Sequence, residues 1–472
     1  MTDLAALDAT AQAELVRTGE VSPKELVAAA IERIERTNPA LNAVIHERFD
    51  KAMAEVDGVD RSTPFAGVPY LAKDAGCATE GDPYHVGLGP LKAAGFRAPA
   101  DSELATRFRR AGFVCVGRTN VPQLLVSATT EPLAYGPTRN PWDTERSSGG
   151  SSGGSGAAVG AGMVPLAHGN DAGGSIRIPA TCCGLVGLKP TRARVSDGPS
   201  MGETWGGLNH EFAVTRSVRD TAALLDALAG RAWGDPYAAP LPARPWSQEV
   251  GADPGRLRIR VVTDLDRMAV DPEIAAAVRA TAALLSDLGH DVADVQLPEL
   301  EEDSGYGAVV AVSIARDVER LAMAAGVAID TGDLEPMPGM ILAGGRAMTG
   351  VQYQAALEQM HAYSRRLEAR WADFDLLLTP TVAVQQAHIG EMAPLADLAE
   401  AGPKLGARTA FTAQFDASGQ PAISLPLHQT AAGLPIGSQL VAATGGEDLL
   451  LRVAAQLEAT LPWADRRPSI FG

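Results

Sequence analysis

The stretch HGNDAGGSIRIPA, at residues 168–180, carries residues that could catalyse acyl transfer. Gly173 and Gly174 precede Ser175, and consecutive glycines let the backbone turn so that neighbouring N–H groups point to one spot. Converging N–H groups form an oxyanion hole, which stabilises the charge that develops on a carbonyl oxygen during acyl transfer. Ser175 is therefore the candidate nucleophile of this segment.

The hydroxyl of Ser175 would be a weak nucleophile and needs a base to remove its proton. His168 is close in the sequence, but a single histidine is more often structural. Lys73 ends the apolar segment GVPYLAK, and burial makes a lysine lose its proton more readily because its pKa falls. Ser151 or Ser152 could relay the proton from the nucleophile to this lysine. The sequence thus contains the parts of a serine-based catalyst.

The run SSGGSSGGSG, at residues 147–156, allows four interpretations. Such runs are often flexible linkers, yet this one lies between two segments that look packed. A phosphate-binding loop needs a Gly-rich motif in a strand–helix context, which is missing here. Residues 150–154 fit the Gly-x-Ser-x-Gly pattern of α/β-hydrolases, but no strand precedes them. We therefore favour the fourth interpretation, in which the run forms half of a split active site.

Helix and strand signals alternate along the whole chain, which is typical of an α/β fold. Ser22 and Glu25 form a capping box that starts one helix, and Ser217 caps another. Apolar runs predict a strand that ends at Lys73 and further strands at 113–117, 257–264, 374–381, 419–427 and 434–442. We expect a single domain over residues 1–472, built on a large mixed, mostly parallel sheet with helices on both faces. The region around 300–350 is expected to form a cap or an inserted lobe.

Composition and charge narrow the class of protein. The formal net charge of −17 argues against nucleic-acid and anionic-membrane partners, which need clustered basic residues. The four cysteines contain no Cys-x-x-Cys pair, so we expect reduced thiols in a cytoplasmic protein. The eight histidines lack the spacing of metal ligands, so we expect no metal and no other cofactor. Neither a signal peptide nor an apolar run of spanning length is visible.

Several segments occur together in a specific order: GVPYLAKD, GGSSGGSGAAV, GNDAGGSIRIPA, GLVGLKPT and the pair GQPAISLP and GLPIGSQL. This ordered set resembles the amidase signature family over roughly residues 1–465. The resemblance implies the fold of that family and hydrolysis of carboxylic amide bonds through an acyl-enzyme. It implies that Ser175 is the nucleophile, Ser151 the bridging serine and Lys73 the base, with a cis peptide bond before Ser151.

The resemblance also implies roles for residues around the nucleophile. The backbone N–H groups expected to hold the oxyanion are those of Ala172, Gly173, Gly174 and Ser175. The residues expected to support the site are Ser152, Asp171 and Arg177. A pair between Asp171 and Arg177 would fix the loop.

Within the family, the resemblance is strongest to enzymes that open the amide bonds of nylon oligomers. Segment 305–321 lacks a cysteine that is expected in the pocket of those enzymes, and Asp416 stands where asparagine is more common. The core reaction therefore carries over better than the substrate does. Lys189 is expected to be solvated or to cap a turn, and Trp205 to be a packing residue in a loop that could reach the pocket.

Two alternatives to an amide hydrolase stay open. An amidotransferase A subunit would pass ammonia to a partner chain, and a silent scaffold would have the fold without the activity. The intact set of Lys73, Ser151 and Ser175 argues against the scaffold. The expected partner is a small-molecule amide substrate, and a homodimer is the assembly we consider.

Overall fold

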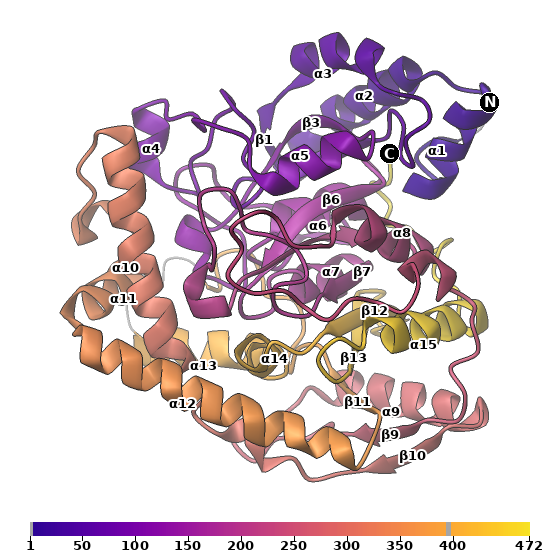
Figure 1. The fold of residues 1–472 in the computed structure, drawn as a ribbon, viewed down its shortest axis with the longest axis vertical. Coiled ribbons are helices and arrows are strands. Elements are labelled where there is room, and N and C mark those ends of the chain that lie inside the picture. Colours follow the sequence, from indigo (N-terminus) through magenta and orange to yellow (C-terminus); the bar gives the residue numbers. More distant parts are fainter. Residues whose placement is uncertain (1–2, 393–397) are drawn as a thin grey trace.

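A computed structural model describes residues 3–392 and 398–472 of the chain (Figure 1). At its centre lies a sheet of eleven strands in the order β1-β3-β2-β6-β8-β7-β12-β13-β11-β9-β10. These strands are β1 (Val44–Glu47), β2 (Pro69–Lys73), β3 (Val114–Thr119), β6 (Leu166–Asp171), β7 (Val186–Lys189), β8 (His210–Thr215), β9 (Arg258–Val261), β10 (Asp291–Asp294), β11 (Leu376–Pro380), β12 (Ala422–Gln429) and β13 (Pro435–Val441). A separate ribbon of β4 (Arg139–Asn140) and β5 (Asp143–Ser147) leads into the Ser/Gly run.

The sheet is mixed, as the sequence predicts. β2 is parallel to β3 and β6, and β9 is parallel to β10 and β11. The other neighbouring pairs are antiparallel. The parallel share is smaller than the alternation of helices and strands indicates, because β12 returns as β13 through a short turn and needs no helical crossover.

Helices surround the sheet (Figure 1). They are α1 (Ala9–Thr18), α2 (Pro23–Leu41), α3 (Phe49–Glu55), α4 (Gly89–Ala93), α5 (Glu103–Arg110), α6 (Gly153–Gly160), α7 (Arg177–Cys183), α8 (Val218–Leu228), α9 (Pro272–Asp287), α10 (Tyr306–Ala325), α11 (Pro336–Ala347), α12 (Gly350–Ala369), α13 (Leu398–Thr409), α14 (Ala413–Ser418) and α15 (Glu447–Thr460). Helices α6 and α7 pack on each other and on central strands, and α8 packs on α15 and β8. The predicted α/β class is confirmed.

Local capping signals act as the sequence predicts. Helix α2 follows Ser22, whose side chain accepts the N–H of Glu25, and the Glu25 carboxylate accepts the N–H of Ser22 in return. Ser217 caps α8 by accepting the N–H of Asp220. Each such cap typically stabilises its helix by about 1 kcal/mol.

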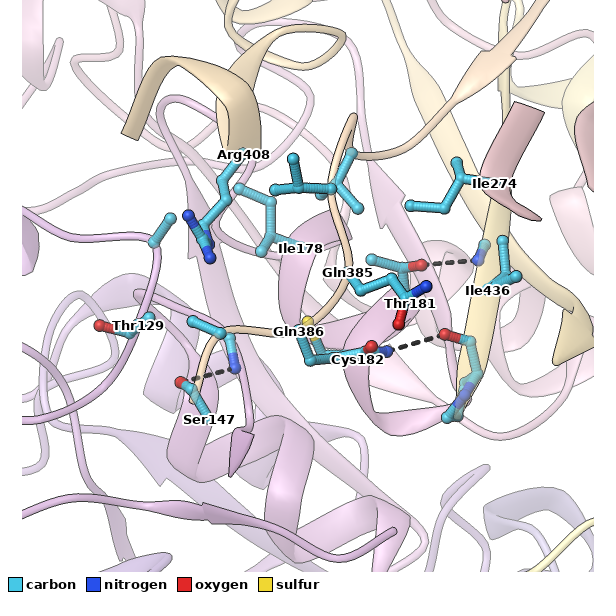
Figure 2. A pocket seen from close by; sticks show the side chains of 17 residues that line it. Thr129, Ser147, Ile178, Thr181, Cys182, Ile274, Gln385, Gln386, Arg408 and Ile436 are labelled. Carbon is cyan, nitrogen blue, oxygen red and sulfur yellow. Dashed lines mark hydrogen bonds between the residues drawn. The ribbon is translucent and has the colours of Figure 1, made fainter. Parts of the chain in front are cut away.

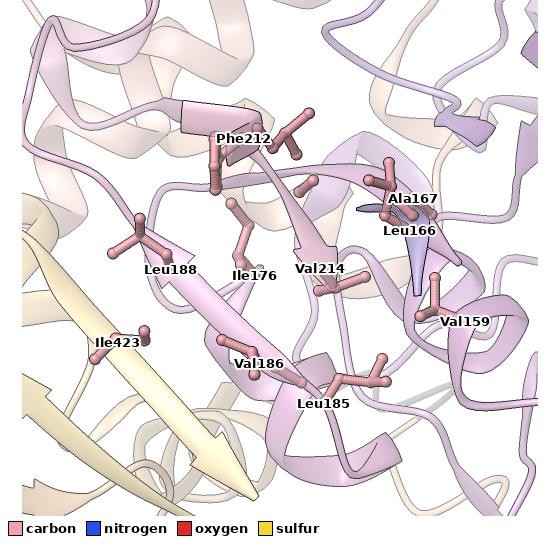
Figure 3. Close-up of a cluster of buried hydrophobic side chains, with 14 of the residues drawn as sticks. Val159, Leu166, Ala167, Ile176, Leu185, Val186, Leu188, Phe212, Val214 and Ile423 are labelled. Atoms are coloured by element: carbon pink, nitrogen blue, oxygen red, sulfur yellow. The ribbon is translucent and has the colours of Figure 1, made fainter. Parts of the chain in front are cut away.

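The main apolar core holds the segments that precede α6 and α7. Figure 3 shows Leu188, Phe212 and Val214 of the central strands packed with Val159 of α6 and with Ile176, which directly precedes α7. All five side chains are buried. Burying an aliphatic or aromatic side chain of this size contributes roughly 1.5–3 kcal/mol. The loops that carry Ser151 and Ser175 are therefore anchored in the main apolar core.

The region around 300–350 is mainly helical. Helix α10 contacts α11 and α12, and the three lie together at one side of the molecule (Figure 1). Ile314 and Val318 of α10 pack against Leu91 and Leu124 of the N-terminal half. A role of this region as a cap stays a prediction.

Three global features complete the description. The four cysteines are buried free thiols, as expected. Within residues 3–392 and 398–472, no helix combines the length and apolar character that membrane crossing requires. The same residues contain no cluster of three side chains suited to hold a metal ion.

Candidate active site

Lys73 lies at the carboxyl end of β2 and is fully buried. Its Nζ is 2.7 Å from the Ser151 Oγ and 2.6 Å from the Asn170 Oδ1. Burial lowers the pKa of Lys73 to about 7, although the negative charges of Glu211 and Asp171 oppose this shift. Near neutral pH, a large share of the Lys73 side chains therefore carries an unprotonated amine that can accept a proton.

The neighbouring strand β6 holds this lysine in place. The Lys73 backbone N–H donates to the His168 Nδ1, and the His168 Nε2 donates to the Glu211 carboxylate at 2.6 Å. Glu211 also accepts a hydrogen bond from the Asn170 side chain. Burial lowers the pKa of His168, which fits a neutral ring with its proton on Nε2. His168 thus supports the position of the lysine and does not face a serine.

The Ser/Gly run is a packed loop, so the linker interpretation is wrong. All residues from 147 to 156 are buried, and α6 begins inside the run. A Cβ on Gly150 would lie 2.6 Å from the Thr129 carbonyl oxygen, and one on Gly154 would lie 2.4 Å from the Asn120 nitrogen. Only glycine fits such close backbone contacts. The peptide bond between Gly150 and Ser151 is cis, as the resemblance implies.

The turn before Ser175 is held by hydrogen bonds to Asp171 and to Thr412. Asp171 accepts the N–H groups of Gly174, Ile176 and Arg177, and the Thr412 hydroxyl donates to the Gly173 carbonyl at 2.7 Å. Gly174 has a φ of 124°, a conformation that side-chain-bearing residues rarely adopt.

The hydrogen bonds of this turn exclude one of the four predicted oxyanion donors. The N–H of Gly174 donates to Asp171 at 2.6 Å and is not free for an oxyanion. The N–H groups of Ala172, Gly173 and Ser175 make no hydrogen bond to any other described residue. Three of the four expected donors are therefore available to a ligand.

The predicted pair of Asp171 and Arg177 is present and extends to a second carboxyl group. Arg177 contacts Asp171 at 2.9 Å and Asp416 at 2.8 Å, and all three side chains are fully buried. The Arg177 guanidinium holds the pKa of Asp171 well below its usual range, against the effect of burial. Burial and the Asp171 charge raise the pKa of Asp416. The network anchors the loop under Ser175 to α14.

Ser151 and Ser175 line one cavity of 270 Å³. Ser152 supports this arrangement, because its N–H donates to the Ser175 carbonyl at 3.3 Å and its hydroxyl contacts the Asn170 carbonyl. The Ser175 hydroxyl makes no hydrogen bond to another described residue, and Ser175 lines the cavity. Among the described residues, no Asp, Glu, Lys or Arg side chain lines this space, and most of its walls are apolar.

A second cavity of 400 Å³ adjoins the first. The two share Leu125, Asn170, Trp205 and Asn209 as lining residues. The Trp205 indole N–H donates to Asp317 at 2.8 Å, which fixes the ring in this shared wall. Trp205 therefore reaches the pocket, as one expectation for its loop suggested.

A much smaller cavity of 20 Å³ lies beside α7 (Figure 2). It is bordered by Thr181 and Cys182 of α7, by Ile274 of α9 and by Gln386 (Figure 2). It contains neither Lys73 nor a serine of the proposed set and has room for about one water molecule. It is not the candidate site.

Comparisons with known proteins show the family to which this chain belongs. The profile of the Amidase family matches residues 25–451. The chain is 46% identical to a 6-aminohexanoate-cyclic-dimer hydrolase of Paenarthrobacter ureafaciens, over 98% of this chain and 97% of that one. The chain belongs to the amidase family. It is an amidase, a hydrolase of carbon–nitrogen bonds other than peptide bonds.

Solved structures place this amidase in the same family. A 6-aminohexanoate cyclic dimer hydrolase complexed with substrate superposes with a TM-score of 0.96 at 45% identity and covers 100% of both chains. A bacterial aryl acylamidase superposes with a TM-score of 0.89 at 26% identity and covers 98% of both chains. The predicted family fold is confirmed.

Trp205→Ala is expected to shift the amidase toward longer substrates, because it removes part of the wall between the two cavities. We expect the ratio of kcat/KM for long over short linear amides to rise about tenfold, the smaller end of the effect of one methylene group in an apolar pocket. Measuring kcat/KM for a series of linear amides of increasing length checks this. Asp317→Asn, which keeps the indole, should change the ratio far less; equal ratios in wild type and Trp205→Ala would contradict the prediction.

Three residues of the site escape sequence reasoning. Asn170 lies inside a recognised motif, yet nothing in the motif shows that its Oδ1 contacts Lys73. Thr412 reaches Gly173 across more than 200 positions of sequence. Tyr306 lines the cavity from α10, a region that carries no catalytic motif. A signal existed only for Asn170, as a polar residue near the carboxyl end of a buried strand.

Proposed function

We propose that this amidase hydrolyses uncharged aliphatic amides, cyclic and linear, through an acyl-enzyme on Ser175. The observation that carries the proposal is the contact of 2.7 Å between the buried Lys73 amine and the Ser151 hydroxyl, at the wall of the cavity that Ser175 also lines. Such a base and hydroxyl pair is the usual means of activating a serine in the absence of a histidine.

The proton path in this proposal runs through one bridging hydroxyl. The neutral amine of Lys73 takes the proton of Ser151 while Ser151 takes that of Ser175. The Ser175 Oγ bonds to the amide carbon and gives a tetrahedral intermediate. The relay then returns the proton to the leaving nitrogen as the carbon–nitrogen bond breaks. The oxygen of a water molecule then bonds to the acyl carbon and gives one proton to the relay. The relay returns a proton to the Ser175 Oγ as the acyl carbon–oxygen bond breaks, and the carboxylic acid leaves.

Backbone groups beside Ser175 would hold the oxyanion of this intermediate. The free N–H groups are those of Ala172, Gly173 and Ser175, while the N–H of Gly174 is held by Asp171. Donors fixed in a rigid loop need no reorganisation during the reaction, which makes them effective in stabilising charge. Asp171, Arg177 and Ser152 would act by holding this loop.

The lining of the cavity supports an uncharged substrate. A charged group would lose hydration in a space whose described walls carry no charge to compensate it. A cyclic amide has no charged ends and suits such a pocket. The relative at 46% identity is named for the hydrolysis of the cyclic dimer of 6-aminohexanoate, which fits this class.

A panel of amides tests the proposal. Cyclic diamides, linear aliphatic amides, aryl amides and glutamine are incubated with the purified chain, and free amine or ammonia is measured. We expect cyclic and linear aliphatic amides to be cleaved and glutamine to be poor. Cleavage of glutamine alone would favour the amidotransferase A subunit, and no cleavage of any amide would favour the silent scaffold. The homodimer and the cytoplasmic location stay predictions.

A further inference from the structure

One hydroxyl of the α10 region reaches the turn that precedes Ser175. Helix α10 begins at Tyr306, and the side chain of Tyr306 lines the same cavity as Ser151 and Ser175. A Cβ built on Gly173 would lie 2.5 Å from the Tyr306 hydroxyl oxygen and 3.5 Å from the ring carbon that bears it. The hydroxyl, rather than the face of the ring, therefore points at Gly173.

The backbone before Tyr306 fixes this direction. Gly305 has a φ of 80°, and a Cβ on it would lie 2.8 Å from the carbonyl oxygen of Ala356 in α12. Its N–H donates to the Asp303 side chain at 2.9 Å. Helices α10 and α12 are in contact (Figure 1), and the Tyr306 ring joins the apolar cluster between them. The phenol is thus presented to the cavity by a rigid support.

The Tyr306 hydroxyl makes no hydrogen bond to any other described residue. Tyr306 is half-buried and lines the cavity, so its O–H is available to a ligand bound there. Burial raises the pKa of Tyr306, and the nearby charges of Asp416 and Asp171 raise it further. The phenol therefore keeps its proton near neutral pH and can donate a hydrogen bond.

We propose that the Tyr306 hydroxyl donates a hydrogen bond to the substrate's acyl oxygen as this oxygen gains charge, together with the free N–H of Gly173. The proposal rests on the proposed function. The N–H of Gly174 donates to Asp171 and is therefore lost as a donor to the oxyanion. The Tyr306 hydroxyl, which lies beside Gly173, would supply the missing hydrogen bond. No covalent change occurs at Tyr306, since the phenol keeps its proton. Helix α10 then contributes directly to the reaction.

Tyr306→Phe tests the proposal, because phenylalanine keeps the ring packing and removes only the hydroxyl. We expect kcat/KM to fall about 10²-fold, the typical cost of removing one oxyanion donor. The fall should lie in kcat, with KM little changed. It should be equal for an amide and for an activated aryl ester with the same acyl group, since both pass through the same oxyanion. A trifluoromethyl ketone, whose adduct with Ser175 carries an oxyanion, should bind more weakly by a similar factor.

Tyr363→Phe is the matched control. Tyr363 lies in the same apolar cluster, on α12, and its buried hydroxyl also has no partner among the described residues, but it does not line the cavity. Its loss should leave kcat/KM unchanged within about twofold.

The outcomes separate this proposal from the proposed function. If wild type turns over both substrates and Tyr306→Phe matches it, this proposal alone is overturned. A loss confined to the amide would also overturn it, because the hydroxyl would then assist the leaving nitrogen. If wild type turns over neither substrate, the proposed function fails and this proposal fails with it. Thermal unfolding of both variants, monitored by circular dichroism, shows whether they are folded.

Discussion

Ser175→Ala is expected to abolish amide hydrolysis, with kcat reduced about 10⁴-fold or more, as when the nucleophile of a hydrolase is removed. The physical reason is that Ser175 offers the cavity an unpartnered hydroxyl beside the free N–H groups of Gly173 and Ser175 itself. Alanine keeps the turn but leaves no atom to bond with the carbonyl carbon. Steady-state kinetics on the substrate that wild type cleaves best gives the measurement.

The neighbouring serine supplies a control for this result. Ser152→Ala removes a hydroxyl that contacts only the Asn170 carbonyl at 3.3 Å, so it should cost far less, about tenfold at most. A fluorophosphonate reagent should add its mass to Ser175 in wild type and in Ser152→Ala, and not in Ser175→Ala. Retention of more than a tenth of wild-type activity in Ser175→Ala would disprove the assignment of the nucleophile.

Local signals in the sequence were sufficient for much of the fold. The capping box of Ser22 and Glu25 starts α2 because both partners lie within one helical turn. The strand that ends at Lys73 and the buried strand β11 were visible as apolar runs. Strand direction was less visible, because it depends on which strands meet in space. The antiparallel pairing of β6 with β8 therefore appears only in the structure.

The site could be predicted only where its residues lie inside ordered motifs. Lys73, Ser151 and Ser175 were found in this way, and the structure brings the first two into contact. Tyr306 carries no comparable signal, because a lone tyrosine in the first turn of an amphipathic helix is ordinarily a packing residue. Thr412 and Asp416 come from a segment that follows the α10 region and meets the turn only in the fold.

Lys189 shows how burial escapes sequence reasoning. A lysine followed by Pro-Thr was expected to be solvated or to cap a turn, but its side chain is fully buried and donates to the Pro190 carbonyl. Burial lowers the pKa of Lys189 to about 7, as for Lys73. The pKa alone would therefore leave two candidate bases, and the contact with Ser151 favours Lys73.

Lys73→Met is expected to lower kcat/KM about 10³-fold or more and to remove its dependence on pH near neutrality, because the relay loses its proton acceptor. Wild-type kcat/KM should rise with pH up to about 7 and then level off, since the unprotonated amine of Lys73 is the active form and its pKa is about 7. Below this value, kcat/KM should fall about tenfold per pH unit. The measurement is kcat/KM between pH 5 and 9 for both proteins.

Lys189→Met distinguishes the two buried lysines, because it removes the other amine with a pKa of about 7. Lys189 contacts neither serine of the relay. Lys189→Met should therefore keep the fall in kcat/KM below pH 7, here called the acid limb, while Lys73→Met loses it. If the fall in kcat/KM below pH 7 vanished in Lys189→Met and persisted in Lys73→Met, Lys189 would be the base and the assignment to Lys73 would be wrong. Recovery of full wild-type kcat by Lys73→Met at high pH would show that hydroxide, rather than a fixed amine, suffices to activate Ser175. Because the acid limb follows a single protonation, its position and its loss together identify the group that holds the proton.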